Sequence, residues 1–136
     1  MHKLFLDANI LFAATYSEAG ASRALFRLAK KRKIKLVSNT YAIKEALKNI
    51  KFKIGEEKVP TFYQLISLLS AVDKETDYET YESIITQKDA PILAGTKNQK
   101  TDYLITLDRK DFLTDKINKT KLPFSIMTPG EYLQSL

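Results

Sequence analysis

The sequence predicts an α/β fold in a single domain of residues 1–136, with a parallel sheet flanked by helices on both faces. The length of 136 residues suits one domain with one hydrophobic core. Short apolar runs, typical of strands buried on both faces, alternate with longer segments that carry apolar residues at helical spacing. This alternation of strand and helix is the pattern of parallel sheets covered by helices.

The first part of the chain predicts a strand, a helix and a second strand. Residues 2–7, HKLFLD, form a short apolar run that ends on an aspartate. Residues 21–33 carry apolar side chains at helical spacing, with Ser22 as the expected N-cap. Residues 34–38, IKLVS, alternate and then become apolar, which is typical of a strand.

The middle of the chain predicts two further helices. In residues 39–51 the spacing places Ile43, Leu47 and Ile50 on one side of a helix. Residues 60–72 predict a helix that starts with a proline, at a position where the missing N–H group costs little.

The last part of the chain returns to strand and helix patterns. Residues 77–87 fit either a helix or a strand, whereas residues 89–99 predict a helix begun by an aspartate and a proline. Residues 102–108, DYLITLD, predict a third strand that also ends on an aspartate. Residues 123–136 predict a last strand and a final short helix.

The composition excludes several classes of protein. No apolar run is long enough to span a membrane, and the N-terminus lacks the pattern of a secretory signal. The absence of cysteine excludes disulfides and thiolate metal sites, and it fits a cytoplasmic protein. The net charge of +6 and the pI of about 9.4 favour a polyanionic partner such as nucleic acid.

Four acidic residues attract attention because of where they fall. Asp7 and Asp108 each follow a predicted strand, so we expect both at the carboxyl rim of the sheet, where open parallel sheets bind ligands. Asp89 opens the helix before the last of these strands, and Glu45 has apolar neighbours in its helix. Carboxylates held close together repel unless a cation bridges them, and Mg²⁺ and Mn²⁺ prefer oxygen ligands.

Each of these acids also has a simpler interpretation. An aspartate after a strand, as at Asp7 and Asp108, is commonly a turn residue or a helix cap. Asp89 is well placed to cap the helix that it precedes. Glu45 fits a solvent-exposed helical acid paired with a neighbouring lysine. The metal site is favoured only because all four acids occur together.

Four segments resemble one known family: FLDANILFAA, AIKEALKN, KDAPILAGT and DYLITLDRKDF, in this order and across nearly the whole chain. They are similar to the PIN-domain nucleases, which include the toxins of VapC-like toxin–antitoxin pairs. The resemblance implies a three-layer α/β/α fold and hydrolysis of RNA at an acidic Mg²⁺ or Mn²⁺ site, with 5′-phosphate and 3′-hydroxyl ends. It also implies an antitoxin protein as partner and a homodimer.

Carried over residue by residue, the resemblance implies a role for six positions. The four acids of the metal site and catalytic centre fall on Asp7, Glu45, Asp89 and Asp108. Asn9 and Thr106 match polar positions that orient the ligand carboxylates or a metal-bound water. The alternatives are a turn-forming asparagine at Asn9 and an ordinary β-branched strand residue at Thr106.

The sequence departs from the family pattern near the third and fourth motifs. Gly95 and Thr96 stand where the family more often has alanine, which matters little if that helix face only packs. Asp111 follows the last motif and is an additional candidate for orienting the site. Asp102 precedes the predicted strand and is therefore expected at its opposite end.

The cations closest in sequence to the acidic motifs are candidate RNA contacts: Lys97, Arg109 and Lys110. Arg109 is the preferred phosphate contact because it follows Asp108 directly. The basic run KKRKIK, residues 30–35, is a second candidate for binding phosphate. We favour the solvated end of a helix for this run, since it precedes a strand and lies at the rim opposite the acids.

Three other functions compete with a metal-dependent ribonuclease. The single histidine, His2, stands beside the N-terminus, which disfavours histidine-based cleavage through the 2′-hydroxyl. A phosphatase of the haloacid-dehalogenase class also starts with a strand ending in aspartate, but it needs a second acid where this chain has Asn9. A noncatalytic PIN-like module that binds RNA or protein without cleavage is the remaining alternative.

Overall fold

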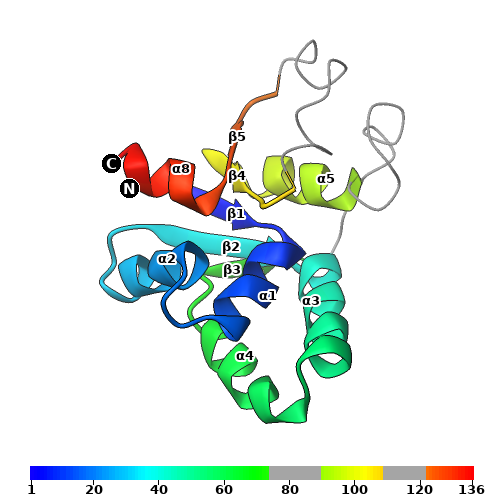
Figure 1. Ribbon diagram of the computed structural model, residues 1–136. Helices are drawn as coiled ribbons and strands as arrows, with labels where there is room; N and C mark the ends of the chain where they lie inside the picture. The colour runs from blue at the N-terminus through cyan, green and yellow to red at the C-terminus, as the bar shows by residue number, and fades with distance from the viewer. Residues whose placement is uncertain (74–89, 109–121) are drawn as a thin grey trace.

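A five-stranded sheet forms the centre of the computed structural model, which describes residues 1–73, 90–108 and 122–136 (Figure 1). The strand order is β3-β2-β1-β4-β5, and every neighbouring pair is parallel. The strands are β1 (Lys3–Leu6), β2 (Lys35–Asn39), β3 (Ala71–Asp73), β4 (Tyr103–Ile105) and β5 (Ser125–Met127). The predicted parallel sheet is therefore confirmed.

The central strand β1 lies between β2 and β4. Leu4 is in register with Leu36 of β2 on one side and with Tyr103 of β4 on the other. The chain builds outward from β1 through β2 to β3, and then crosses to the other half with β4 and β5. The direction of winding thus reverses between β1 and β4, and ligands of open α/β sheets bind beyond the carboxyl ends of the strands at such a reversal.

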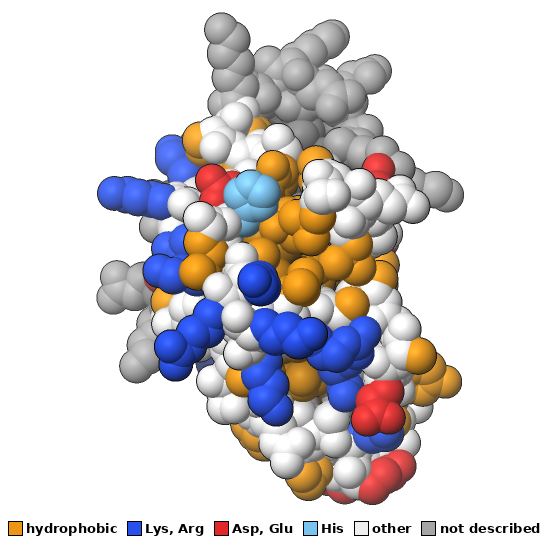
Figure 2. Space-filling model, turned by 90° about the vertical axis from the view of Figure 1, so that its left-hand side faces the viewer, with side chains coloured by type: hydrophobic (Ala, Val, Ile, Leu, Met, Phe, Trp, Pro, Cys, Tyr) orange, Lys and Arg blue, Asp and Glu red, His pale blue; other side chains and the backbone are white. Residues whose placement is uncertain are grey.

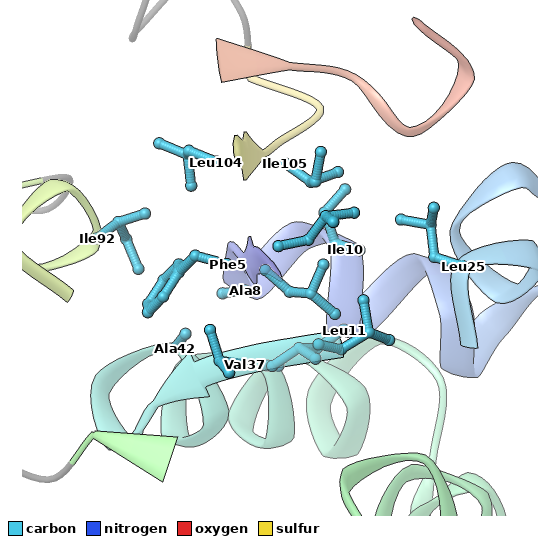
Figure 3. Packing of buried hydrophobic residues seen from close by; sticks show 14 of the residues in the cluster. Phe5, Ala8, Ile10, Leu11, Leu25, Val37, Ala42, Ile92, Leu104 and Ile105 are labelled. Carbon is cyan, nitrogen blue, oxygen red and sulfur yellow. The ribbon is translucent and has the colours of Figure 1, made fainter. Parts of the chain in front are cut away.

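Helices cover both faces of the sheet. They are α1 (Ala8–Tyr16), α2 (Ala21–Lys30), α3 (Thr40–Lys53), the short 3₁₀ helix η1 (Glu56–Lys58), α4 (Val59–Ile66), α5 (Ala90–Asn98) and α8 (Pro129–Gln134). Figure 3 shows Ile10 of α1 and Leu25 of α2 on one side of β1, and Ile92 of α5 on the other. This is the three-layer α/β/α architecture that the resemblance implies.

The central strand is buried on both faces, which explains its apolar sequence. Leu4, Phe5 and Leu6 are each 0% exposed. The ring of Phe5 lies between Ile92 of α5 and Ala42 of α3 (Figure 3). A strand in this position requires apolar residues at consecutive positions rather than an alternating pattern.

The predicted N-cap of α2 is wrong. The helix begins at Ala21 after Gly20, which caps it without a side-chain hydrogen bond. Ser22 lies inside the first turn and is 5% exposed. A serine one residue into a helix has the same local sequence signature as a capping serine, and only the packing of the first turn separates the two.

The prediction that residues 60–72 form one helix is also wrong. The helix α4 ends at Ile66, and Ala71–Asp73 form the edge strand β3 beside β2. The backbone N–H of Ser70 already donates to the carbonyl of Leu36 at 2.7 Å. Pairing with β2 thus overrides the local apolar pattern, which fits a helix equally well.

Helix α1 is absent from the elements that the sequence predicts. It contacts α2, α3 and α4, so it is apolar around most of its circumference and lacks an amphipathic period. Residues 77–87, which fit a helix or a strand, lie outside the described residues. Among the helices of the described ranges, none has the length and apolar character needed to cross a membrane.

Candidate active site

A pocket of about 200 Å³ lies at the carboxyl ends of β1 and β4. Three acidic residues line it: Asp7 at the end of β1, Glu45 on α3, and Asp108 after β4. The other lining residues are Ala8, Asn9, Phe12, Asn49 and Lys53. The fold therefore brings three of the four predicted acids to one pocket at the reversal of winding.

Asp7 ends β1 and also caps α1. Its backbone N–H donates to the carbonyl of Ile105 at 3.1 Å, which extends the pairing of β1 with β4. Its Oδ1 atom accepts a hydrogen bond from the backbone N–H of Ala8 at 2.6 Å. The simple interpretation of Asp7 as a helix cap is thus correct, and the same carboxylate, 5% exposed, lines the pocket.

A hydrogen-bond network fixes the other oxygen of Asp7. The hydroxyl of Thr106 donates to Asp7 Oδ2 at 2.8 Å and accepts from the backbone N–H of Asp108 at 3.0 Å. The amide of Asn9 donates to Asp7 Oδ2 at 3.3 Å and to Thr106 Oγ1 at 3.2 Å. Its Oδ1 atom accepts from the backbone N–H of Leu107 at 3.1 Å. Asn9 and Thr106 therefore hold both the carboxylate of Asp7 and the backbone that leads to Asp108.

Asn39 positions the helix that carries Glu45. Its side-chain oxygen caps α3 by accepting from the backbone N–H of Ala42 at 2.9 Å. Its amide nitrogen donates to the carbonyl of Pro91 in α5 at 3.1 Å. One buried side chain thus ties the first turns of α3 and α5 together.

Three pocket residues lie four positions apart on α3: Glu45, Asn49 and Lys53. Glu45 is half-buried, and Lys53 is exposed. Neither Asn49 nor Lys53 is predicted from the sequence, although residues spaced by four from Glu45 share its helix face. Nor is Phe12, which reaches the pocket through the packing of α1 against α3 and carries no sequence signal of its own.

Other predicted site residues are placed elsewhere or fall outside the described ranges. Those outside are Asp89, Asp111, Arg109 and Lys110. Lys97 is exposed in the last turn of α5, and the chain then enters the amino end of β4. Because Asp108 follows the other end of β4, Lys97 and the pocket lie at opposite ends of the sheet.

The opposite rim carries the residues that the sequence analysis sets apart from the acids. Asp102 accepts a hydrogen bond from the backbone N–H of Lys3 at 2.8 Å. The Nδ1 atom of His2 lies 2.8 Å from the hydroxyl of Tyr132 in α8. Burial raises the pKa of the Tyr132 phenol, and neighbouring Tyr103 and Asp102 raise it further. His2 therefore makes its side-chain contact at the opposite rim, far from the pocket.

The basic run of residues 30–35 also lies at this opposite rim, between α2 and β2. Its cationic residues, Lys30, Lys31, Arg32, Lys33 and Lys35, are all exposed. Figure 2 shows Lys and Arg side chains gathered on the face that carries the histidine. The expected separation of this run from the acids is therefore confirmed.

The pocket offers the hard oxygen donors that Mg²⁺ and Mn²⁺ prefer. These are the carboxylates of Asp7, Glu45 and Asp108 and the amide oxygen of Asn49. Within residues 1–73, 90–108 and 122–136, however, no three Asp, Glu, His or Cys side chains form a group that could hold a metal ion. The donor chemistry fits a divalent cation, and the full set of ligands stays a prediction.

Comparison with solved structures identifies proteins of the same fold. The chain is similar to a structure of VapBC2 from Rickettsia felis bound to a DNA fragment from the promoter, with a TM-score of 0.66 and 18% identity over 91% of this chain and 96% of that one. It is also similar to VapBC-1 from nontypeable Haemophilus influenzae, with a TM-score of 0.61 and 15% identity over 94% and 98% of the two chains.

Comparison with family models identifies the family. No curated protein matches the chain. Residues 3–110 match the model of the PIN domain, which covers both strand-end aspartates, Asn9, Glu45 and Thr106. Since this match extends over more than half of the sequence, the chain belongs to the PIN-domain family.

Proposed function

We propose that this protein is a metal-dependent endoribonuclease that hydrolyses RNA and leaves 5′-phosphate and 3′-hydroxyl ends. The observation that carries the proposal is the pocket at the reversal of winding, lined by Asp7, Glu45 and Asp108. Membership of the PIN-domain family supports the same assignment.

In this proposal four carboxylates hold Mg²⁺ or Mn²⁺: Asp7, Glu45, Asp89 and Asp108. When bound, such an ion supplies a water of lowered pKa and offsets negative charge on the phosphate under attack. Thr106 and Asn9 keep Asp7 in one orientation through the hydrogen bonds described above. Asp111 is a further candidate for orienting the site.

Histidine chemistry has no support at this pocket. The only histidine in the sequence, His2, lies at the opposite rim beside Tyr132. A phosphatase of the haloacid-dehalogenase class is also disfavoured, because such an enzyme needs an acid at the position of Asn9. The Asn9 amide has no acidic proton, and it donates hydrogen bonds to Asp7 and Thr106. For RNA contacts near the acids we retain Arg109 and Lys110, and we leave out Lys97 because of its place at the far end of α5.

We further propose that the protein is the toxin of a toxin–antitoxin pair, with an antitoxin protein as partner. The similarity of its fold to VapBC2 and VapBC-1 supports this assignment. We also propose that the protein is cytoplasmic, that it forms a homodimer, and that residues 1–136 fold as one domain.

A cleavage assay tests the enzymatic proposal. Purified protein is incubated with mixed cellular RNA in Mg²⁺, in Mn²⁺ and in excess EDTA, and the product ends are mapped. We expect cleavage with either metal, none in EDTA, and none with the Asp7→Asn variant. Full activity in EDTA with 2′,3′-cyclic phosphate products would overturn the proposal.

A noncatalytic RNA-binding module is the second candidate. It is favoured by one observation, that the acidic side chains in the described part of the chain do not form a group able to hold a metal ion. This candidate predicts RNA binding without cleavage in either metal and no difference in binding between EDTA and Mn²⁺.

A further inference from the structure

Two aromatic residues stand one turn apart on α1 beside the acidic pocket. Phe12 lines the pocket and is half-buried, and Tyr16 is 65% exposed. Their rings are parallel to within 6°, and the ring centroids are 6.4 Å apart. The fully buried part of α1 consists of other residues, among them Ile10 and Leu11; Phe12 packs against this cluster with part of its surface, and Tyr16 is exposed.

The rings of Phe12 and Tyr16 form a stacked pair at the wide end of the distance range of aromatic contacts. Rings in face-to-face contact have planes only about 3.5–4 Å apart, the distance at which carbon atoms attract most strongly. The centroid separation of 6.4 Å is larger than this plane spacing, and the two ring planes are nearly parallel. The outer ring of this pair, Tyr16, is open to solvent.

Lys53 connects the aromatic pair to the acids. Its Nζ atom lies 6.0 Å from the centroid of the Phe12 ring, within the range of a cation–π contact. It lines the same pocket as Asp7 and Glu45. Lys53 therefore lies both at the acidic pocket and near the Phe12 ring.

We propose that Phe12, Tyr16 and Lys53 form a nucleotide subsite, in which an unpaired base stacks on the rings and Lys53 contacts the adjoining phosphate. This inference rests on the proposed function, and it assigns the contact with one unpaired nucleotide of the RNA to these three side chains. Aromatic side chains bind single strands in this way because every base has a π face, whereas bases in a helix are already stacked on their neighbours. A flanking lysine supplies a phosphate contact without reading sequence.

Equilibrium binding separates the two parts of the subsite. The probes are a fluorescently labelled oligouridylate and a strand of the same length built from abasic ribose phosphates, with Ca²⁺ in place of Mg²⁺ to prevent cleavage. Tyr16→Leu should lower the affinity for oligouridylate by about 5- to 150-fold, the range for loss of one stacked base, and leave the abasic strand unaffected. Lys53→Gln should weaken both strands equally and reduce the log–log salt slope by about 0.7.

Two matched variants control for general effects. Tyr63→Leu removes another exposed tyrosine, 53% exposed on α4, and Lys48→Gln removes an exposed lysine from α3 that does not line the pocket. Both should bind both strands as the parent does. Because Tyr16 is exposed, its substitution should leave the melting temperature unchanged, which confirms that the variant is folded.

The outcomes distinguish this subsite from the enzymatic proposal. The subsite is overturned if the parent binds the two strands with equal affinity, even if RNA is cleaved. It is also overturned if Tyr16→Leu binds oligouridylate as tightly as the parent does. The predicted binding pattern without cleavage in Mg²⁺ or Mn²⁺ would overturn the ribonuclease and leave the subsite intact.

Discussion

At the scale of single residues, Thr106 is the connecting group of the pocket. Its hydroxyl donates to Asp7 at 2.8 Å and accepts from the backbone N–H of Asp108 at 3.0 Å. Thr106→Val keeps the shape of the side chain and removes these two bonds and the one that the hydroxyl accepts from the amide of Asn9 at 3.2 Å. Groups that orient metal ligands typically change metal affinity or activity by about 10- to 100-fold. We expect a loss of that size in the cleavage rate at a fixed Mn²⁺ concentration.

Thr101→Val is the matched control for this change. Thr101 is also buried, and its hydroxyl donates to the carbonyl of Thr96 at 2.7 Å at the other end of β4. It should lower stability by about 0.5–1.5 kcal/mol, because the carbonyl of Thr96 loses one hydrogen bond and keeps the one from the backbone N–H of Thr101, and leave the cleavage rate unchanged. Similar rates for the Thr106→Val variant and the parent would show that the hydroxyl does not support the site.

The residues of the pocket differ in how well the sequence reveals them. Asp7 and Asp108 are visible because an apolar strand that ends on an aspartate marks the carboxyl rim of a parallel sheet. Asn49 and Lys53 become meaningful only once the face of α3 that turns to the pocket is known. Phe12 lies in a uniformly apolar run, so no local pattern separates it from the core residues around it.

At the scale of elements, the contact of α5 with the sheet depends on Gly95. A Cβ atom at this position would lie 2.6 Å from Nδ2 of Asn39 and 2.8 Å from the Phe5 ring. The helix face that carries Gly95 packs, and the space that an alanine methyl needs is filled by the side chain that ties α3 to α5. Gly95→Ala should destabilise the protein by about 1–3 kcal/mol, as measured by urea unfolding.

Gly130→Ala provides the comparison for this prediction. Gly130 lies in α8, and a Cβ atom there would meet nothing within 4 Å. Alanine should be neutral there or stabilise by about 0.5–1 kcal/mol, because it restricts the unfolded chain more than glycine does. If Gly95→Ala is as well tolerated as Gly130→Ala, the contact of α5 with Asn39 and Phe5 is looser than described.

The two elements that the sequence does not predict are α1 and β3, and each has its own cause. Helix α1 packs against three other helices and is apolar around most of its circumference, and β3 is a three-residue edge strand whose partner β2 lies far away in the sequence. Period-based reasoning detects an element by the contrast between its buried and exposed faces. Where the contrast is missing, or where pairing is purely tertiary, the local sequence does not specify the outcome.

At the scale of the whole molecule, charge is separated along the strand direction. The acids line the pocket at the carboxyl ends of the strands, whereas the basic run of residues 30–35 lies at the amino ends (Figure 2). From residue 19 to residue 44 the sequence contains no Asp or Glu. The net charge of +6 therefore says little about the charge in the pocket, where three carboxylates face one lysine among the described residues.

Metal-dependent stability tests the central claim, that Asp7 and its acidic neighbours form one divalent-cation site. A ligand that binds only the folded state stabilises it, by about 2.7 kcal/mol at a concentration of 100 Kd. The parent, Asp7→Asn and Asp102→Asn are each melted in EDTA and in millimolar Mn²⁺. Comparison of shifts rather than of melting temperatures removes the effect of each substitution on the metal-free protein.

The account predicts that Mn²⁺ raises the melting temperature of the parent and of Asp102→Asn by the same several degrees. Asp102 is the matched control because its carboxylate lies at the opposite rim, where it accepts a hydrogen bond from the backbone N–H of Lys3. Asp7→Asn should show little or no shift, although asparagine can still cap α1. A shift in Asp7→Asn equal to that of the parent, or no shift in the parent, would contradict the account.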